Sequence, residues 1–218
     1  MTFLQMVKQY LPEKFWNFGA RIKKNYYKWQ YLRGKRPKVA AETSKAFSRR
    51  ERENFFKKFC GGYGLDIGFG GDLIVSNATG YDFEHGDARF LNNIQDETYN
   101  FVYSSHTLEH LDDPTLALKN WFRVLKKNGY LILYIPHRDL YEKKRTLPSR
   151  FNDNHKHFFL LDRDEEPDTL GILPLISRTL NGYEIVYAKE CSEGNTITDP
   201  LLHSDGEYSI EVVIRKTK

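Results

Sequence analysis

The chain has 218 residues, a formal net charge of +4 and 40% hydrophobic residues. This length accommodates one α/β domain with an appended segment. No apolar run reaches the roughly 18 residues that a membrane-spanning helix needs, and the N-terminus lacks the apolar core of a secretory signal. The two cysteines, Cys60 and Cys191, form neither a disulfide framework nor a ligand cluster. We therefore interpret them as reduced thiols in a cytoplasmic protein.

Charge is distributed unevenly along the chain. Residues 1–60 hold 16 basic and 4 acidic residues, whereas residues 61–218 hold 17 basic and 25 acidic residues. We therefore expect a basic, aromatic helical extension over 1–60, joined to an acidic domain over 61–218. A basic segment of this kind favours phosphate groups or an anionic membrane face.

The extension shows a helical pattern. Apolar and aromatic side chains recur every three or four residues from Leu4 to Trp29, which predicts one apolar stripe. Pro12 is expected in the first turn of a second helix, residues 33–38 form a basic linker, and a further helix is predicted over Ala41–Phe59. The stripe fits packing on the domain or on a second copy of the chain. It also fits a membrane surface, whereas no nucleic-acid-binding motif accompanies the charge.

From Gly64 onward, predicted strands and helices alternate. This alternation predicts an α/β fold with a mainly parallel sheet and helices on both faces. Residues 137–166 are loop-rich, basic and aromatic. The predicted helices cover about Pro114–Lys127 and about 167–181. The predicted strands are Gly64–Ile67, Ala78–Asp82, Tyr99–Ser104, Tyr130–Ile135, Tyr183–Lys189 and Glu207–Arg215.

The segment from Gly64 to Asp72 is the most informative motif. A short apolar strand contains Asp66 and runs into a glycine-rich turn. Glycine adopts positive φ without steric cost, so such a turn brings backbone N–H groups close to a ligand. In an open α/β sheet, ligands bind at the carboxyl ends of the strands. The motif therefore predicts a ligand site at the end of the first strand.

Two further features follow at the same sheet edge. Asp82 ends the second strand, where its carboxylate can accept hydrogen bonds from both hydroxyls of a ribose. Asp87 can accept a hydrogen bond from an adenine amine, and the small Ala88 leaves room for the ring. Together with the glycine turn, these residues predict a nucleoside site.

These motifs resemble those of the class I S-adenosylmethionine-dependent methyltransferases. The resemblance covers roughly residues 60–140 and implies a Rossmann-like, seven-stranded sheet with S-adenosylmethionine as the cofactor. Asp72 stands at the third glycine position, and the connection from Asp82 to Asp87 is shorter than the usual helix. The matching segments are Leu65–Gly70, Gly80–Asp82, Gly86–Ala88, Phe101–Leu111 and Arg123–Leu131.

The resemblance also implies roles for individual residues. Asp66 and the turn would hold the methionine part of the cofactor, and Asp82 would hold the ribose. Ser105 and His106 would border both the cofactor and the acceptor pocket. The complete predicted cofactor set is Asp66, Gly68, Phe69, Gly70, Asp82, Asp87, Ala88, Ser105 and His106.

His106, Glu109 and His110 are candidates for a metal site. These residues carry metal-ligating groups, but no Cys/His set with the expected spacing accompanies them. We therefore predict no metal, and we expect His110 to be a structural, hydrogen-bonding histidine.

The acceptor side is predicted within residues 137–166. Its basic and aromatic side chains suit an anionic or polyhydroxyl acceptor, such as a phosphorylated sugar. A solvated, mobile lid is the alternative. A hydroxyl acceptor would benefit from a general base, for which His137 is the first candidate and His155 and Tyr141 are the next. A phosphate acceptor would need no base.

The expected reaction is methyl transfer to an oxygen of a sugar or phosphate group. The motif pattern resembles bacterial methyltransferases of surface-polysaccharide and glycolipid synthesis, which implies a lipid-linked acceptor and peripheral contact of residues 1–38 with the inner membrane. Three alternatives remain: a methyltransferase for a small metabolite or quinone-like lipid, an RNA methyltransferase, and a non-catalytic binding protein. The intact Asp66, Gly68, Gly70 and Asp82 argue against the non-catalytic alternative.

Overall fold

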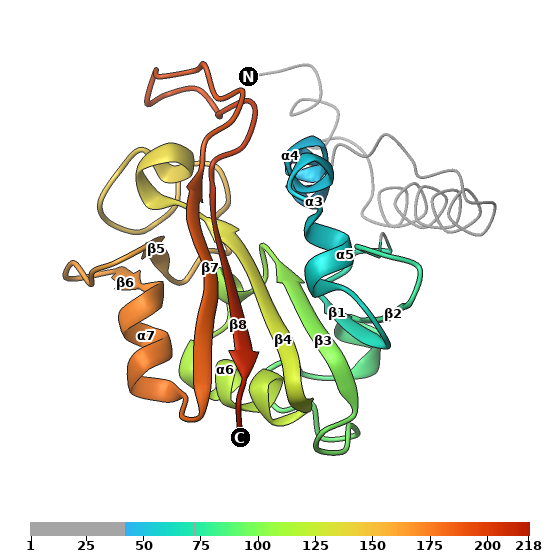
Figure 1. The fold of residues 1–218 in the computed structure, drawn as a ribbon. Helices are drawn as coiled ribbons and strands as arrows, with labels where there is room; N and C mark the ends of the chain where they lie inside the picture. The colour runs from blue at the N-terminus through green and yellow to red at the C-terminus, as the bar shows by residue number, and fades with distance from the viewer. Residues whose placement is uncertain (1–41, 72) are drawn as a thin grey trace, which may run out of the picture. The chain divides into compact units, whose positions relative to one another are not determined.

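The structure is a computed structural model that describes residues 42–71 and 73–218. The predicted apolar stripe, the basic linker and Asp72 lie outside the described residues. The main element is a six-stranded sheet with the order β2-β1-β3-β4-β8-β7 (Figure 1). Its strands are β1 Gly64–Ile67, β2 Ala78–Tyr81, β3 Tyr99–Ser105, β4 Leu125–Pro136, β7 Tyr183–Cys191 and β8 Ser209–Lys216.

Strand directions confirm the predicted α/β class. Strand β1 is parallel to β2 and β3, and β3 is parallel to β4. The last strand, β8, is antiparallel to both β4 and β7, as expected. The carboxyl ends of β1, β2 and β3 therefore meet at one edge of the sheet. A separate two-stranded ladder joins β5, Phe158–Leu160, to β6, Thr169–Gly171.

The expected seventh strand is not present in the described sheet. Residues 86–98, which follow the nucleoside motif, form turns instead. Helix α6, Pro114–Arg123, occupies their backbone carbonyls: Trp121 Nε1 donates to the Ala88 carbonyl at 2.8 Å, and Asn120 Nδ2 donates to the Arg89 carbonyl at 2.8 Å. These hydrogen bonds hold the turns against α6, and no strand pairing is present along residues 86–98.

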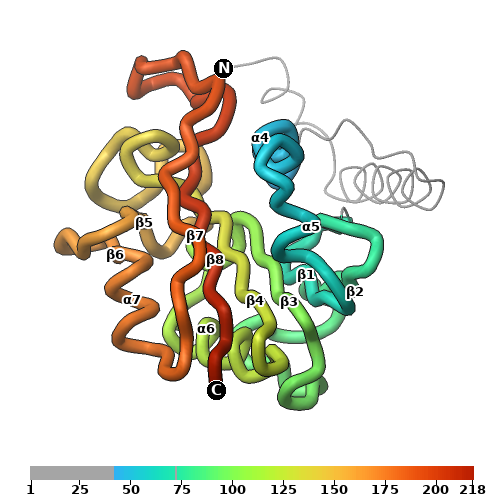
Figure 2. The backbone as a smooth tube through the Cα atoms, in the orientation of Figure 1, coloured from blue at the N-terminus to red at the C-terminus, as the bar shows by residue number. Residues whose placement is uncertain are grey.

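Helices cover both faces of the sheet, as predicted. Successive side chains of a strand point to opposite faces. Val102 of β3 accordingly packs with buried side chains of α6 and of α7, Ile172–Thr179. The neighbouring Phe101 and Tyr103 pack on the other face with Phe55 of α5. Figure 2 traces the same arrangement along the backbone.

The predicted helix over Ala41–Phe59 is three short helices. They are α3 Glu42–Lys45, α4 Phe47–Arg52 and α5 Phe55–Phe59. Asn54 precedes α5 with a left-handed φ of 55°, a conformation that Asn tolerates better than most residues. The predicted helices over 114–127 and 167–181 are likewise shorter, because β4 already begins at Leu125 and β6 occupies 169–171.

Helix α4 is anchored to the sheet by buried charges. Arg50 Nε donates to Glu211 Oε1 at 2.8 Å, and Arg49 Nη2 donates to Glu207 Oε2 at 2.8 Å. All four side chains are at most 2% exposed. A buried charge needs such a partner, because burial removes its hydration. The described part of the predicted extension, residues 42–60, therefore packs on the sheet.

The loop-rich stretch over 137–166 contains ordered elements. A turn of π-helix, η3, spans Arg138–Glu142, and β5 follows at Phe158–Leu160. None of the helices in the described ranges has the length and apolarity that crossing a bilayer demands.

Candidate functional site

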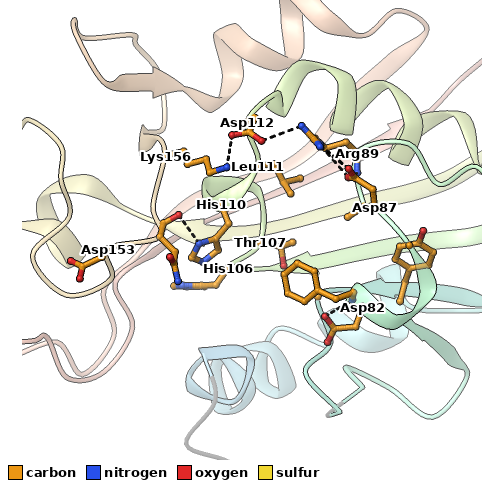
Figure 3. A pocket seen from close by; sticks show the side chains of 16 residues that line it. Asp82, Asp87, Arg89, His106, Thr107, His110, Leu111, Asp112, Asp153 and Lys156 are labelled. Atoms are coloured by element: carbon orange, nitrogen blue, oxygen red, sulfur yellow. Dashed lines mark hydrogen bonds and ion pairs between the residues drawn. The ribbon is translucent and has the colours of Figure 1, made fainter. Parts of the chain in front are cut away.

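A cavity of about 970 Å³ opens at the carboxyl ends of β1, β2 and β3. This is the edge at which ligands bind in parallel α/β sheets, and the volume suits a cofactor-sized ligand. Figure 3 shows how side chains from these strand ends and from the segment before β5 surround it. Its lining is formed by Gly68, Tyr81, Asp82, Phe83, Gly86, Asp87, Ala88, Arg89, His106, Thr107, His110, Leu111, Asp112, Asp153, Asn154 and Lys156.

Gly68 begins the turn after β1 and requires glycine for two reasons. Its φ is +74°, and a Cβ at this position would lie 2.0 Å from Thr107 Oγ1. Its N–H donates to the Tyr81 carbonyl at 2.8 Å, which joins the ends of β1 and β2. The backbone of this turn can therefore approach the cavity closely.

The other residues of the predicted methionine site are not among the residues that line the cavity. Asp66 is 2% exposed, and its Oδ2 accepts a hydrogen bond from Ile74 N at 2.7 Å. This bond joins β1 to the segment that follows the glycine turn. Phe69 packs against Gly80, where a Cβ would lie 2.5 Å from the Phe69 ring. Gly70 has a positive φ of 57°.

The turn after β2 places Asp82 and Phe83 at the cavity. Asp82 Oδ1 accepts from Phe83 N at 2.9 Å, and His85 Nδ1 accepts from Asp82 N at 3.0 Å. These reciprocal bonds are a capping box, which fixes the short helix η1, Phe83–His85. The Phe83 ring is 96% exposed, so it offers an uncovered aromatic face at the cavity.

Asp87 lies at the opposite end of this turn and is held by Arg89. Arg89 Nη2 donates to Asp87 Oδ2 at 2.7 Å, and Arg89 N donates to Oδ1 at 2.8 Å. These hydrogen bonds lower the pKa of Asp87. Arg89 also reaches Asp112 at 3.2 Å, and Asp112 contacts Lys156 (Figure 3). Acidic and basic side chains therefore alternate along the rim of the cavity.

His106 follows β3 in a strained conformation. Its φ of 48° is left-handed, which costs a residue with a Cβ about 1–3 kcal/mol and often occurs at functional sites. His106 N donates to the Tyr134 carbonyl at 2.8 Å, and Nε2 lies 2.9 Å from Ser209 Oγ. Burial lowers the pKa of His106, which favours the neutral imidazole. Ser105 is buried behind the lining.

The three candidate bases differ in their surroundings, and none is among the described lining residues. His137 Nδ1 accepts from Asp139 N at 3.1 Å, and its Nε2 lies 3.2 Å from Glu190 Oε1. Both ring nitrogens of this first candidate are therefore engaged. Tyr141 is buried, with its ring centroid 5.4 Å from that of His155. Burial raises the pKa of Tyr141, so its phenol remains protonated at neutral pH.

The remaining candidate, His155, belongs to a buried polar cluster. Its Nδ1 lies 2.5 Å from Glu142 Oε1. Its Nε2 lies 3.9 Å from the carboxylate of Glu109, a residue of η2, Leu108–His110. Burial raises the pKa of Glu109 to about 8. The chain thus brings His155 beside the His106–His110 segment.

Comparison with known proteins supports the prediction of a methyltransferase fold around this edge of the sheet. Residues 54–133 match the family model described as a methyltransferase domain. The chain therefore contains a methyltransferase domain, and S-adenosylmethionine is the cofactor that its sequence motifs imply. The match covers β1, β2 and β3 with their connecting turns, and most of β4. A comparison of the methyltransferase with curated proteins found no match.

Two solved structures share the fold of the methyltransferase. An S-adenosylmethionine-dependent methyltransferase from Archaeoglobus fulgidus is 16% identical, with a TM-score of 0.50 over 79% of this chain and 95% of that chain. A candidate methyltransferase from Bacillus halodurans is 14% identical, with a TM-score of 0.50 over 78% of this chain and 100% of that chain. At these identities the likeness concerns the fold.

The chemistry of the cavity fits the cofactor. Asp82 offers a carboxylate for ribose hydroxyls, Phe83 an aromatic face for adenine, and Gly68 a backbone that a ligand can approach. When bound, S-adenosylmethionine supplies a methyl group on a positively charged sulfur, which departs as a neutral thioether. Because the leaving group is already activated, the protein mainly has to orient the reactants and exclude water.

Sequence reasoning missed several lining residues. Phe83 and Arg89 lie directly beside the predicted Asp82 and Asp87, so the motif itself pointed to their position. Thr107 is identifiable only through its contact with Gly68. The approach of His155 to Glu109 has no local signal, because the two residues belong to distant parts of the chain.

Proposed function

We propose that the methyltransferase acts on an oxygen of a sugar or phosphate group in a bacterial polysaccharide or glycolipid. The observation that carries this proposal is the polarity of the cavity wall contributed by the acceptor side. Asp153, Asn154 and Lys156 line it from the segment before β5. Carboxylate, amide and ammonium groups together match the donors and acceptors of a hydroxyl-rich ligand, and Lys156 also suits phosphate oxygens.

The same wall disfavours a quinone-like lipid. Such an acceptor needs an apolar enclosure from residues 137–166, yet the cavity-lining residues from that range are polar. Lys156 and Arg89 both contact Asp112, so the two cations at the rim are partly balanced. A neutral sugar therefore suits the wall as well as an anionic one.

The site residues receive roles within this proposal. We assign Asp82 to the ribose, the Gly68 turn to the methionine part, and Ala88 with Phe83 to the adenine. Asp66 supports the turn through its hydrogen bond to Ile74. None of the candidate bases His137, His155 and Tyr141 lines the described cavity, so orientation of the acceptor hydroxyl is the main role proposed for the protein.

Residues 1–38 are proposed to hold the enzyme at the cytoplasmic face of the inner membrane. Their sequence is rich in Lys, Arg and aromatic residues, which suits an anionic lipid surface. Such contact would bring the enzyme to the membrane that holds a lipid-linked acceptor. Deleting 1–38 should reduce sedimentation with anionic liposomes while cofactor affinity remains unchanged; a full-length protein that ignores such liposomes would refute this placement.

The acceptor proposal is tested by product analysis. The enzyme is incubated with methyl-labelled S-adenosylmethionine and four acceptor classes: nucleotide sugars, lipid-linked sugars, a quinol analogue and RNA. We expect an O-methyl signal by NMR and a mass gain of one CH2 on a sugar or its phosphate. Methylation of only the quinol or RNA would overturn the acceptor assignment. Calorimetry with the cofactor alone is the control, since lack of binding would instead question the enzyme preparation or the cofactor site.

A further inference from the structure

Glu109 is a buried carboxylate without hydrogen-bond donors. Its side chain is fully buried, and neither carboxylate oxygen has a hydrogen-bond partner. Burying an ionisable group in this state is costly unless a cation or another donor compensates it. Glu109 lies on η2 beside His110, which lines the cavity.

Three imidazole nitrogens surround the same oxygen of Glu109. The distances to Oε1 are 3.6 Å from His106 Nδ1, 3.7 Å from His110 Nε2 and 3.9 Å from His155 Nε2. These separations are too long for hydrogen bonds. They match ligand atoms around one ion, because metal–ligand bonds of about 2.0–2.2 Å place neighbouring ligand atoms about 3–4 Å apart.

The hydrogen bonds of two histidines direct their lone pairs toward Glu109. His110 Nδ1 lies 3.1 Å from the Asn154 carbonyl, which only accepts, so Nδ1 carries the proton. His155 Nδ1 lies 2.5 Å from Glu142 Oε1, and Ser149 Oγ donates to the other Glu142 oxygen at 2.5 Å. In the neutral form of either ring, Nε2 then carries the lone pair. Fixing the second ring nitrogen in this manner is typical of metal-ligating histidines.

We propose that Glu109, His110 and His155 bind a divalent transition-metal ion. Their ligand atoms all lie within 4.8 Å of one another. Two imidazoles and one carboxylate suit Zn²⁺ and neighbouring transition metals better than Mg²⁺ or Ca²⁺, which prefer oxygen ligands. This proposal departs from the expectation from sequence that no metal binds, because spacing along the chain did not show that His155 joins the Glu109–His110 pair.

The ion would lie at the wall of the cavity, because His110 contributes to the lining. Three protein ligands leave at least one position of a four-coordinate ion open. An acceptor oxygen is suited to that position, a role that rests on the proposed oxygen acceptor. Metal binding itself does not depend on the identity of the acceptor.

The test measures metal binding on the full chain without cofactor or acceptor. The metal-free protein is titrated with Zn²⁺ by calorimetry and with Co²⁺ by visible absorption. We expect one ion per chain and d–d bands of Co²⁺ bound to nitrogen and oxygen. Glu109→Gln and His155→Ala should each weaken binding at least 100-fold, and Glu142→Gln, which keeps all three ligands, about 10- to 100-fold.

His203→Gln is the matched control, because it removes an exposed imidazole and leaves the three ligands intact. Circular dichroism and cofactor calorimetry show whether each variant is folded. Failure of the wild-type protein to bind either ion would overturn the proposal. So would folded Glu109→Gln and His155→Ala variants that keep wild-type affinity. Neither outcome would alter the product assay, so the metal site and the acceptor assignment are judged separately.

Discussion

The two sides of the cavity are built from different kinds of contact. On the cofactor side, Asp82 and Asp87 are fixed by residues within three positions along the chain. On the acceptor side, His155 reaches Glu109 because a distant segment docks there, with Lys156 N donating to the Glu109 carbonyl at 2.8 Å. One side therefore follows from local sequence, and the other follows from tertiary packing. The two sides should respond separately to substitution.

The largest expected effect is on the acceptor side. Glu142→Ala removes the acceptor for both His155 Nδ1 and Ser149 Oγ, which are buried. Leaving two buried donors unsatisfied should lower the free energy of unfolding by about 2–4 kcal/mol. Urea denaturation measures this change. Cofactor affinity, measured by calorimetry on the folded variant, should remain within about threefold of wild type.

Glu184→Ala serves as the control for this stability effect. Glu184 pairs with Arg215 on the surface, with side-chain exposures of 52% and 40%, and such pairs contribute little. An equal loss of unfolding free energy in both variants would mean that the buried Glu142 contributes no more to stability than the exposed Glu184. A large loss of cofactor affinity in Glu142→Ala would show that the two sides are coupled.

The next effect is on the cofactor side. Asp82→Ala removes a carboxylate proposed to accept two hydroxyl hydrogen bonds, and hydrogen bonds to charged groups are worth about 1.5–3 kcal/mol. Cofactor affinity should therefore fall about 10- to 100-fold by calorimetry. Glu84→Ala, two residues away and outside the lining, should leave affinity unchanged. Unchanged affinity in Asp82→Ala would contradict the ribose assignment.

Much of the sheet and of the cofactor edge was predictable from sequence. Glycine turns, strand ends and alternating apolar residues are local signals, and they placed Gly68, Asp82 and His106 at one cavity. The strand Gly64–Ile67 was predicted with the observed bounds. Each of these features depends on backbone geometry within a few residues.

The remaining features depend on contacts between distant segments. The described sheet has six strands, and residues 86–98 form turns that hydrogen-bond to Trp121 and Asn120 of the distant helix α6; propensity along 86–98 cannot show such a contact. His137 was the first candidate base because it follows β4 directly, yet its nitrogens contact Asp139 and Glu190. Position at a strand end indicates nearness to a site, whereas the hydrogen-bond partners decide whether a side chain is available.

The smallest expected effect comes from a substitution at the rim of the cavity, where Arg89, Asp112 and Lys156 connect the two sides. Arg89 lowers the pKa of Asp87 through side-chain hydrogen bonds. A carboxyl group whose pKa is lower in the folded state adds stability above its unfolded pKa of about 4, and this stability is lost as the pH falls through the folded pKa. Arg89→Ala should therefore raise the pKa of Asp87 toward its ordinary value, measured by carboxyl NMR titration.

The accompanying stability loss should be small at pH 7, because the pair is exposed and screened by salt, and it should be smaller still at pH 3, below the unfolded pKa. Urea denaturation at both pH values measures this difference. Asp112 also contacts Lys156, so the rim keeps one ion pair in Arg89→Ala. A cofactor affinity that fell further than in Asp82→Ala would show that Arg89 itself organises the adenine end, and the cofactor side would then depend on the same rim contacts as the acceptor side.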